Sequence, residues 1–140
     1  MRKRILFFLL VFAGLVQAQI PARENITLYQ GASWRPRVIW TDSNGDTTNI
    51  TNYTIRMHIR SEITSDDTLL TASTDNGLIT INTNQTGTFD INIPASMTAA
   101  LNFRTAYYDI EAVSGAGSVV SGIVYRLMMG RVTLSKEVTR

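Results

Sequence analysis

The chain has 140 residues, of which 13 are Lys or Arg and 11 are Asp or Glu, so its formal net charge is +2. Three of the basic residues, Arg2, Lys3 and Arg4, precede an apolar run, and the rest of the chain has 10 basic residues against 11 acidic ones. A near-neutral domain lacks the electrostatic surface that nucleic-acid binding requires. The absence of Cys and the single His exclude disulfides, thiolate metal sites, cysteine nucleophiles and His clusters. We therefore expect no enzymatic activity, no metal and no cofactor.

The first 18 residues have the pattern of a secretory signal peptide. A positive stretch, Met1 to Arg4, precedes the apolar run Ile5 to Val16, and Val16-Gln17-Ala18 offers small or short residues for cleavage. The run is shorter than the roughly 20 residues that span a bilayer, so we expect no permanent membrane span. The alternative is an uncleaved apolar segment that engages a membrane. The predicted organisation is a signal at 1–18, a β-sandwich at 19–134 and a polar tail at 135–140.

The first predicted strands lie between residues 26 and 46. Ile26 to Tyr29 is a short apolar strand, and Trp34 to Trp40 alternates between two faces. Pro36 has no backbone donor, so the second strand should lie at a sheet edge or be bulged. Asn44-Gly45 is the pair most typical of a hairpin turn, in which both residues have positive φ.

The strand from Tyr53 to Arg60 alternates almost perfectly. Ile55, Met57 and Ile59 should face the core, while Arg56, His58 and Arg60 should face solvent. Four more strands follow: Leu69 to Ser73, Leu78 to Asn82, Phe89 to Ile93, and Tyr107 to Val113. A last long strand is predicted from Val119 to Leu134, with a bulge at Gly130 that resets the side-chain phase.

One short helical turn is predicted at residues 95–101, with Ser96 as its N-cap. Seven to nine strands joined by turns favour an all-β fold, namely an immunoglobulin-like antiparallel β-sandwich. Either Tyr107 or Tyr108, at the start of a strand that follows a corner, is a candidate for the tyrosine corner of such folds.

Few residues of the sequence form a candidate metal-binding or catalytic site. Asp42, Asn44 and Asp46 are spaced like the start of a calcium loop, but Gly45 is misplaced and no Glu follows at the required spacing, which favours a plain turn. His58 stands between two arginines whose charges oppose metal binding, so we expect a surface His.

Asp109 and Glu111 lie side by side on one strand face. If the Tyr53 strand pairs with the Tyr107 strand, Arg56 and Arg60 oppose these carboxylates as a cross-strand charge ladder. We expect this ladder or plain solvation in preference to a catalytic carboxylate pair. A third interpretation is a patch that faces a partner and includes His58 and Tyr107.

The sequence resembles a family of small β-sandwich proteins encoded among the structural genes of tailed phages. The family opens with a "YQG" strand, continues with "W-x-D-x-x-G" and "LTGY-x-x-R-M-x-I-R", and ends in "G-x-V-x-x-S-x-E-V-T-R". The similar segments span Ile26 to Arg140: Ile26-Thr27-Leu28-Tyr29-Gln30-Gly31, Trp40-Thr41-Asp42-Ser43-Asn44-Gly45, Ile50 to Arg60, Tyr108-Asp109-Ile110-Glu111, Arg126 to Ser135, and Glu137-Val138-Thr139-Arg140. Asn52 departs from the pattern, because the family has Gly at that position.

This resemblance implies a non-enzymatic virion component, similar to the immunoglobulin-like N-terminal domain of phage baseplate upper proteins. Such a component would pack in the tail, baseplate, neck or head decoration against other virion proteins, as a homo-oligomer or multi-copy assembly. The candidate contact residues are Arg35, Arg37, Arg56, His58, Arg60 and Tyr107, and the tail 135–140 is a further candidate. The alternative is an exported immunoglobulin-like binding or adhesion domain of a bacterial envelope, secreted or periplasmic.

Overall fold

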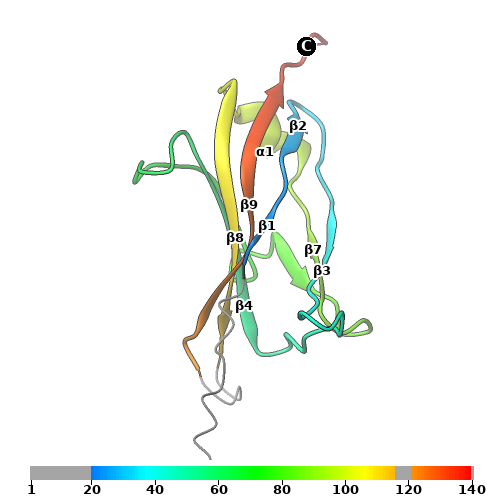
Figure 1. Cartoon of the computed structure of the whole chain (residues 1–140). Helices are drawn as coiled ribbons and strands as arrows, with labels where there is room; N and C mark the ends of the chain where they lie inside the picture. The colour runs from blue at the N-terminus through cyan, green and yellow to red at the C-terminus, as the bar shows by residue number, and fades with distance from the viewer. Residues whose placement is uncertain (1–19, 116–120, 140) are drawn as a thin grey trace, which may run out of the picture.

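The part of the chain that the structure describes forms nine β-strands, arranged as two facing sheets, and one short helix (Figure 1). The computed structural model describes residues 20–115 and 121–139. The predicted all-β, immunoglobulin-like sandwich is confirmed, while the predicted signal at 1–18 and the predicted strand start at Val119 lie outside the described residues. Within the described ranges, no helix has the length and apolar character needed to cross a membrane.

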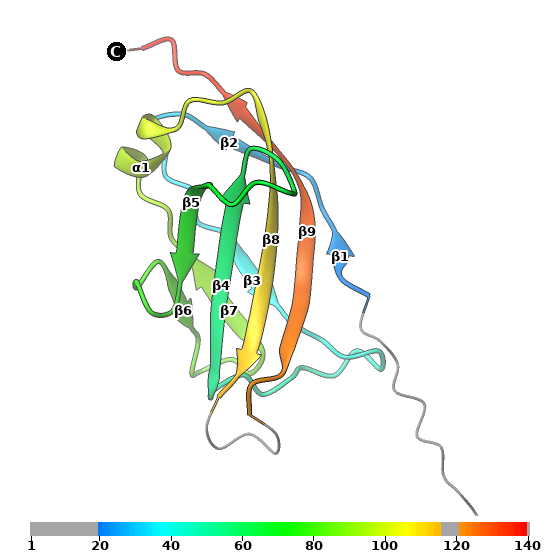
Figure 2. The same cartoon turned by 90° about the vertical axis from the view of Figure 1, so that its left-hand side faces the viewer.

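The larger sheet has the strand order β1-β9-β8-β4-β5, with β2 also paired to β9 (Figure 2). The smaller sheet has the order β3-β7-β6, so β3, which follows Pro36, is an edge strand as predicted. The chain crosses between the sheets after β2, β3, β5 and β7, as in an immunoglobulin-like sandwich. The strands of the larger sheet are β1 (Ala22–Arg23), β2 (Ile26–Tyr29), β4 (Tyr53–Arg60), β5 (Thr68–Ser73), β8 (Thr105–Ser114) and β9 (Val124–Ser135). Those of the smaller sheet are β3 (Arg37–Ile39), β6 (Ile79–Ile81) and β7 (Thr88–Ile91).

The core is made by the inward residues of each alternating strand. Ile55, Met57 and Ile59 of β4 are fully buried, as the sequence alternation predicted. Phe89 of β7 is fully buried from the opposite sheet. Burial of these apolar side chains between the sheets is what fixes which face of the larger sheet is exposed to solvent.

The two N-terminal strands pair with β9 in parallel, whereas all other pairings are antiparallel. Between β1 and β2, the N–H of Glu24 donates to the Met129 carbonyl over 3.0 Å, and the Tyr108 hydroxyl donates to the Glu24 carbonyl over 2.7 Å. This bond reaches 84 residues back along the chain and joins β8 to the segment between β1 and β2, so Tyr108 is not a tyrosine corner, which bonds a few residues upstream.

Gly130 is required for this close crossing and is not the predicted bulge. It pairs regularly with Tyr108, and a Cβ at this position would overlap the Glu24 carbonyl. The register shift between β8 and β9 lies instead between Ile110 and Glu111, where Leu127 is the extra residue on β9.

Two local predictions need correction. In the Asn44-Gly45 turn only Gly45 has positive φ, at 85°, because the turn is wider than a two-residue hairpin and Asp42 accepts hydrogen bonds from the N–H groups of Asn44 and Asp46. The helix α1 (Ala95–Ala100) is capped by Pro94 and not by Ser96, and no side chain makes a cap hydrogen bond. Thr98 instead anchors the helix, because its buried hydroxyl donates to the Ala32 carbonyl over 2.8 Å.

Candidate functional site: a basic pocket on the larger sheet

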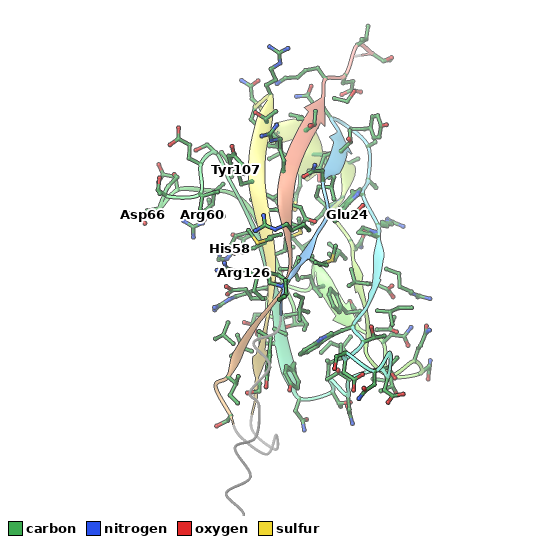
Figure 3. All side chains as sticks on the ribbon, in the orientation of Figure 1. Glu24, His58, Arg60, Asp66, Tyr107 and Arg126 are labelled. Carbon is green, nitrogen blue, oxygen red and sulfur yellow. The ribbon has the colours of Figure 1, made fainter. Side chains whose placement is uncertain are left out.

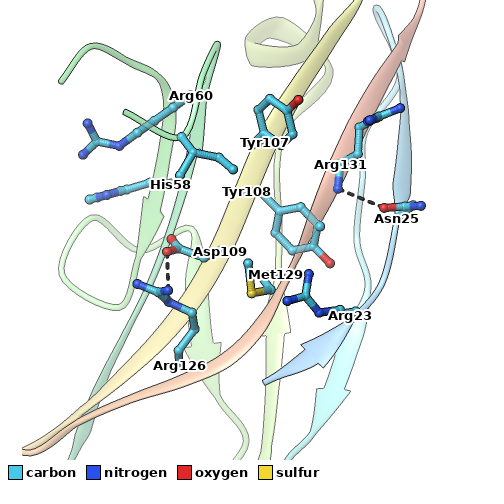
Figure 4. Close-up of a pocket in the computed structure, with 12 residues that line it drawn as sticks. Arg23, Asn25, His58, Arg60, Tyr107, Tyr108, Asp109, Arg126, Met129 and Arg131 are labelled. Carbon is cyan, nitrogen blue, oxygen red and sulfur yellow. Dashed lines mark hydrogen bonds and ion pairs between the residues drawn. The ribbon is translucent and has the colours of Figure 1, made fainter. Parts of the chain in front are cut away.

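The outer face of the larger sheet carries a pocket of about 490 Å³ (Figure 4). Its wall is built from β4, β8 and β9 and from the crossing segment between β1 and β2. We call it the basic pocket, because four arginines and the only His line it while a single carboxylate, Asp109, does so. Its charged and polar lining residues are Arg23, Asn25, His58, Arg60, Tyr107, Tyr108, Asp109, Arg126 and Arg131.

Strand alternation brings three of the predicted contact residues together in this pocket. His58 and Arg60 point outward from β4, and they lie opposite Asp109 and Tyr107 of β8 in the antiparallel register. Arg56, one step further along β4, lies opposite Glu111 and outside the pocket lining. His58, Arg60 and Tyr107 therefore form one side of a shared surface.

The predicted charge ladder exists, with a different partner at one end. Arg56 donates to Glu111 over 2.8 Å, as expected. Arg60 forms no ion pair with Asp109 within the described ranges, and it donates to the Ser65 carbonyl of the next loop. Its place is taken by Arg126 of β9, which lies 3.3 Å from Asp109 and 3.5 Å from Glu111. The ladder thus runs from Arg56 through Glu111 and Arg126 to Asp109.

The two carboxylates of the ladder have pKa values shifted in opposite directions. Burial raises the pKa of Asp109, and the negative charge of Glu111 adds to this, against the opposing effects of Arg126, His58 and Arg60. Burial also acts to raise the pKa of Glu111, but hydrogen bonds and charges from Arg56 and Arg126 outweigh it and lower that pKa.

Three arginines of the pocket have no carboxylate partner. Among residues 20–115 and 121–139, Arg23, Arg60 and Arg131 make no ion pair. Arg131 lies on the outward side of β9 opposite Tyr107, and Arg23 is brought there by the parallel pairing of β1. Sequence reasoning missed Arg23, Arg126 and Arg131, since the pairing of β9 with β8 and β1 is non-local. Strict alternation would set Arg126 and Arg131, which are five positions apart, on opposite faces of β9, and only the extra residue Leu127 brings them to the same face.

Arg35 and Arg37 do not join the pocket. Arg37 lies on the exposed face of the smaller sheet and forms a two-pronged pair with Asp90, at 2.7 and 3.0 Å. This hydrogen-bonded pair raises the pKa of Arg37 and lowers that of Asp90. Arg35 is exposed just before the same edge strand. The contact residues predicted from the sequence are therefore divided between two sheets.

The tail predicted to reach a partner is held to the body at its start. Ser135 ends β9, the N–H of Glu137 donates to the Gln30 side chain over 3.1 Å, and Lys136 donates to Asn102 over 2.6 Å. Gln30 also donates to the Leu101 carbonyl at the end of α1 over 2.9 Å. The first and last motifs of the sequence thus meet at one end of the sandwich, and only the last residues, such as the exposed Val138, extend away.

The chemistry available at the pocket is the binding of negative charge. The described residues contain no group of three or more His, Asp or Glu placed to hold a metal ion. His58 lies opposite Asp109 but is surrounded by arginines, which favour anionic groups as neighbours. The sequence matches no protein-family model, and no curated protein matches it in sequence.

Proposed function

We propose that this protein is a non-enzymatic structural or accessory component of a tailed-phage or prophage particle, which acts through protein–protein contacts in the tail, baseplate, neck or head decoration. The observation that carries the proposal is the basic pocket, where His58, Arg60 and Tyr107, chosen from the sequence as contact residues, lie together with unpaired arginines on an open sheet face. Unpaired arginines and a neighbouring tyrosine are the residue types that protein interfaces favour.

Two further observations support a role as a packing module. The motifs that resemble those of phage structural proteins include "YQG" and the "E-V-T-R" ending, and these two segments contact each other through Gln30 and Glu137. The edge strands β5, β3 and β6 also present backbone groups that a neighbouring subunit can pair with.

The proposal is tested by mass spectrometry of purified particles and of the host periplasm. We expect the chain in particles at a fixed ratio to the major structural proteins. Replacing Arg60 and Arg131 with Glu should lower its incorporation, because two cations of the contact face become anions. The control R104E makes the same kind of charge change at an exposed arginine outside both the pocket and the predicted contact residues, and should leave incorporation unchanged.

The second candidate function is an exported immunoglobulin-like binding domain of a bacterial envelope, and the signal-like pattern of residues 1–18 favours it. The same mass spectrometry separates the two functions. A chain that is absent from particles and begins at Gln19 in the periplasm contradicts the particle proposal and supports export.

A further inference from the structure

An acidic loop protrudes beside the basic pocket. The loop Ser61–Asp67 joins β4 to β5, contains Glu62, Asp66 and Asp67, and has no basic residue. All three acidic residues are exposed, and the loop projects from the sheet, as the positions of Asp66 and Arg60 show (Figure 3). We call it the acidic loop. One face of the molecule therefore carries a negative projection next to a positive hollow.

The acidic loop does not neutralise the pocket of its own chain. Among the described residues, no ion pair joins Glu62, Asp66 or Asp67 to an arginine. Arg60, at the base of the loop, donates to the carbonyl of Ser65 and not to a loop carboxylate. Negative side chains of the loop and positive side chains of the pocket thus lie side by side on one face of the described chain without forming ion pairs with each other.

The loop also supplies an apolar contact. Ile63 lines the pocket, yet 73% of its surface is exposed to solvent. An interface that covers this side chain removes apolar area from water, which stabilises association in a way that charge pairing alone does not. The face therefore combines an apolar anchor with charges of both signs.

Such a face is complementary to itself. When two copies meet face to face about a two-fold axis, the same patch contacts itself, and each acidic loop lies over the basic pocket of the other copy. The arginines come from different strands, and Arg60 and Arg131 point to different sides, so they do not converge on one small anion (Figure 4). A loop with several carboxylates spread along it fits that arrangement better.

We propose that this face binds a second copy of the chain as a symmetric dimer, in which the acidic loop of each copy occupies the basic pocket of its partner. The inference rests on the proposed function, because it names the partner of the same contact face. The dimer is closed, so it does not extend into a filament. Its charge pairs are partly exposed, so its affinity falls as salt rises.

Complementary charge-reversal variants test the dimer by sedimentation at low and physiological salt. E62K/D66K/D67K makes the loop basic, and R23E/R60E/R131E makes the pocket acidic. Each variant alone sets like charges against each other, so we expect self-association about tenfold weaker or more. An equimolar mixture restores both loop–pocket contacts and should form a heterodimer as tight as the wild-type dimer. Circular dichroism checks that each variant is folded.

The control R104E, which changes an exposed arginine outside the face, should dimerise as the wild type does. A wild-type chain that stays monomeric at millimolar concentration overturns the proposal, as does a mixture of the two variants that stays monomeric. Binding of inorganic phosphate or of an acidic peptide to a monomeric chain also overturns it. If the chain is monomeric but is found in particles, the dimer proposal fails and the particle proposal holds. If the chain forms the dimer but is absent from particles, the particle proposal fails and the dimer proposal holds.

Discussion

Asp109 and Glu111 show how two carboxylates on one strand face come to have different pKa values. Both point outward from β8 and contact Arg126, but only Glu111 also has Arg56, which donates two hydrogen bonds to it. The sequence alternation places both on one face. It does not show that the arginine from β9 is shared, since that depends on the shifted register at Leu127.

The two carboxylates should therefore respond oppositely to pH. The lowered pKa of Glu111 means that its ionised form stabilises the fold above its ordinary value of 4.5, and this stability is lost as the pH falls through the lowered pKa. We expect E111Q to lower the free energy of unfolding at neutral pH by no more than about 1 kcal/mol, with the loss vanishing in acid.

For Asp109 the sign is reversed. Its raised pKa means that ionisation of Asp109 lowers the free energy of unfolding. This destabilisation is absent below pH 3.8 and grows as the pH rises through the raised pKa. D109N should be neutral or slightly stabilising at neutral pH. Urea unfolding of both variants from acid to neutral pH measures this, and equal losses in the two variants would contradict the assignment.

At the scale of elements, the strands predicted correctly are those with a local pattern. The alternation of β4 fixed its bounds and its buried face, and the same holds for the inward residues of β8. The two-residue strand β1 is exposed at both positions and has no pattern to read. A glycine in a strand indicates either a bulge or a close backbone approach, and the sequence alone does not separate the two at Gly130, because the approach of Glu24 is visible only in three dimensions.

Gly130→Ala tests the crossing of the N-terminal segment over β9. The added methyl group would overlap the Glu24 carbonyl, so the crossing segment must move and break its bonds to Met129 and Tyr108. We expect a loss of about 1–3 kcal/mol in unfolding free energy. Hydrogen exchange should show faster exchange of the Glu24 amide.

Tyr108→Phe is the milder companion variant, because it removes only the hydroxyl. Burial raises the pKa of Tyr108 to about 12, with a further contribution from the charge of Glu24. The hydroxyl is therefore protonated at neutral pH and can donate its hydrogen bond to the Glu24 carbonyl. Tyr108→Phe should lower the free energy of unfolding by about 1 kcal/mol, which is less than the loss expected for Gly130→Ala. Exchange at Glu24 that is unchanged in both variants would contradict this account of the crossing.

At the scale of the whole molecule, stability depends on apolar contact between the sheets, because the chain has no Cys. Phe89 is fully buried on β7, so Phe89→Ala should cost about 3–5 kcal/mol. The control Ile39→Ala, half exposed on the adjacent strand β3, should cost far less. Tryptophan fluorescence and far-ultraviolet circular dichroism should show one shared transition at lower denaturant; separate transitions would mean that the sheets unfold independently.

The candidate site shows the same division between local and non-local information. The shared face of His58, Arg60 and Tyr107 can be predicted from the alternation of β4 and β8 and from the pairing of these two strands. Arg23 and Arg131 reach the pocket only because β9 pairs with β8 on one side and with the N-terminal strands on the other. The charge of the pocket is therefore a property of the assembled sheet, and no single segment of the sequence contains it.

The parallel pairing of β2 with β9 has a mechanical consequence. The described chain enters along the larger sheet at β1 and leaves past the far end of β9, near α1 (Figure 1). Tension applied between residues 20 and 139 would slide β2 along β9, so that their backbone hydrogen bonds are loaded together and not opened one after another. Resistance to such a pull is set by the rate at which β1 and β2 separate from β9. The terminal strands thus act as a clamp against tensile load.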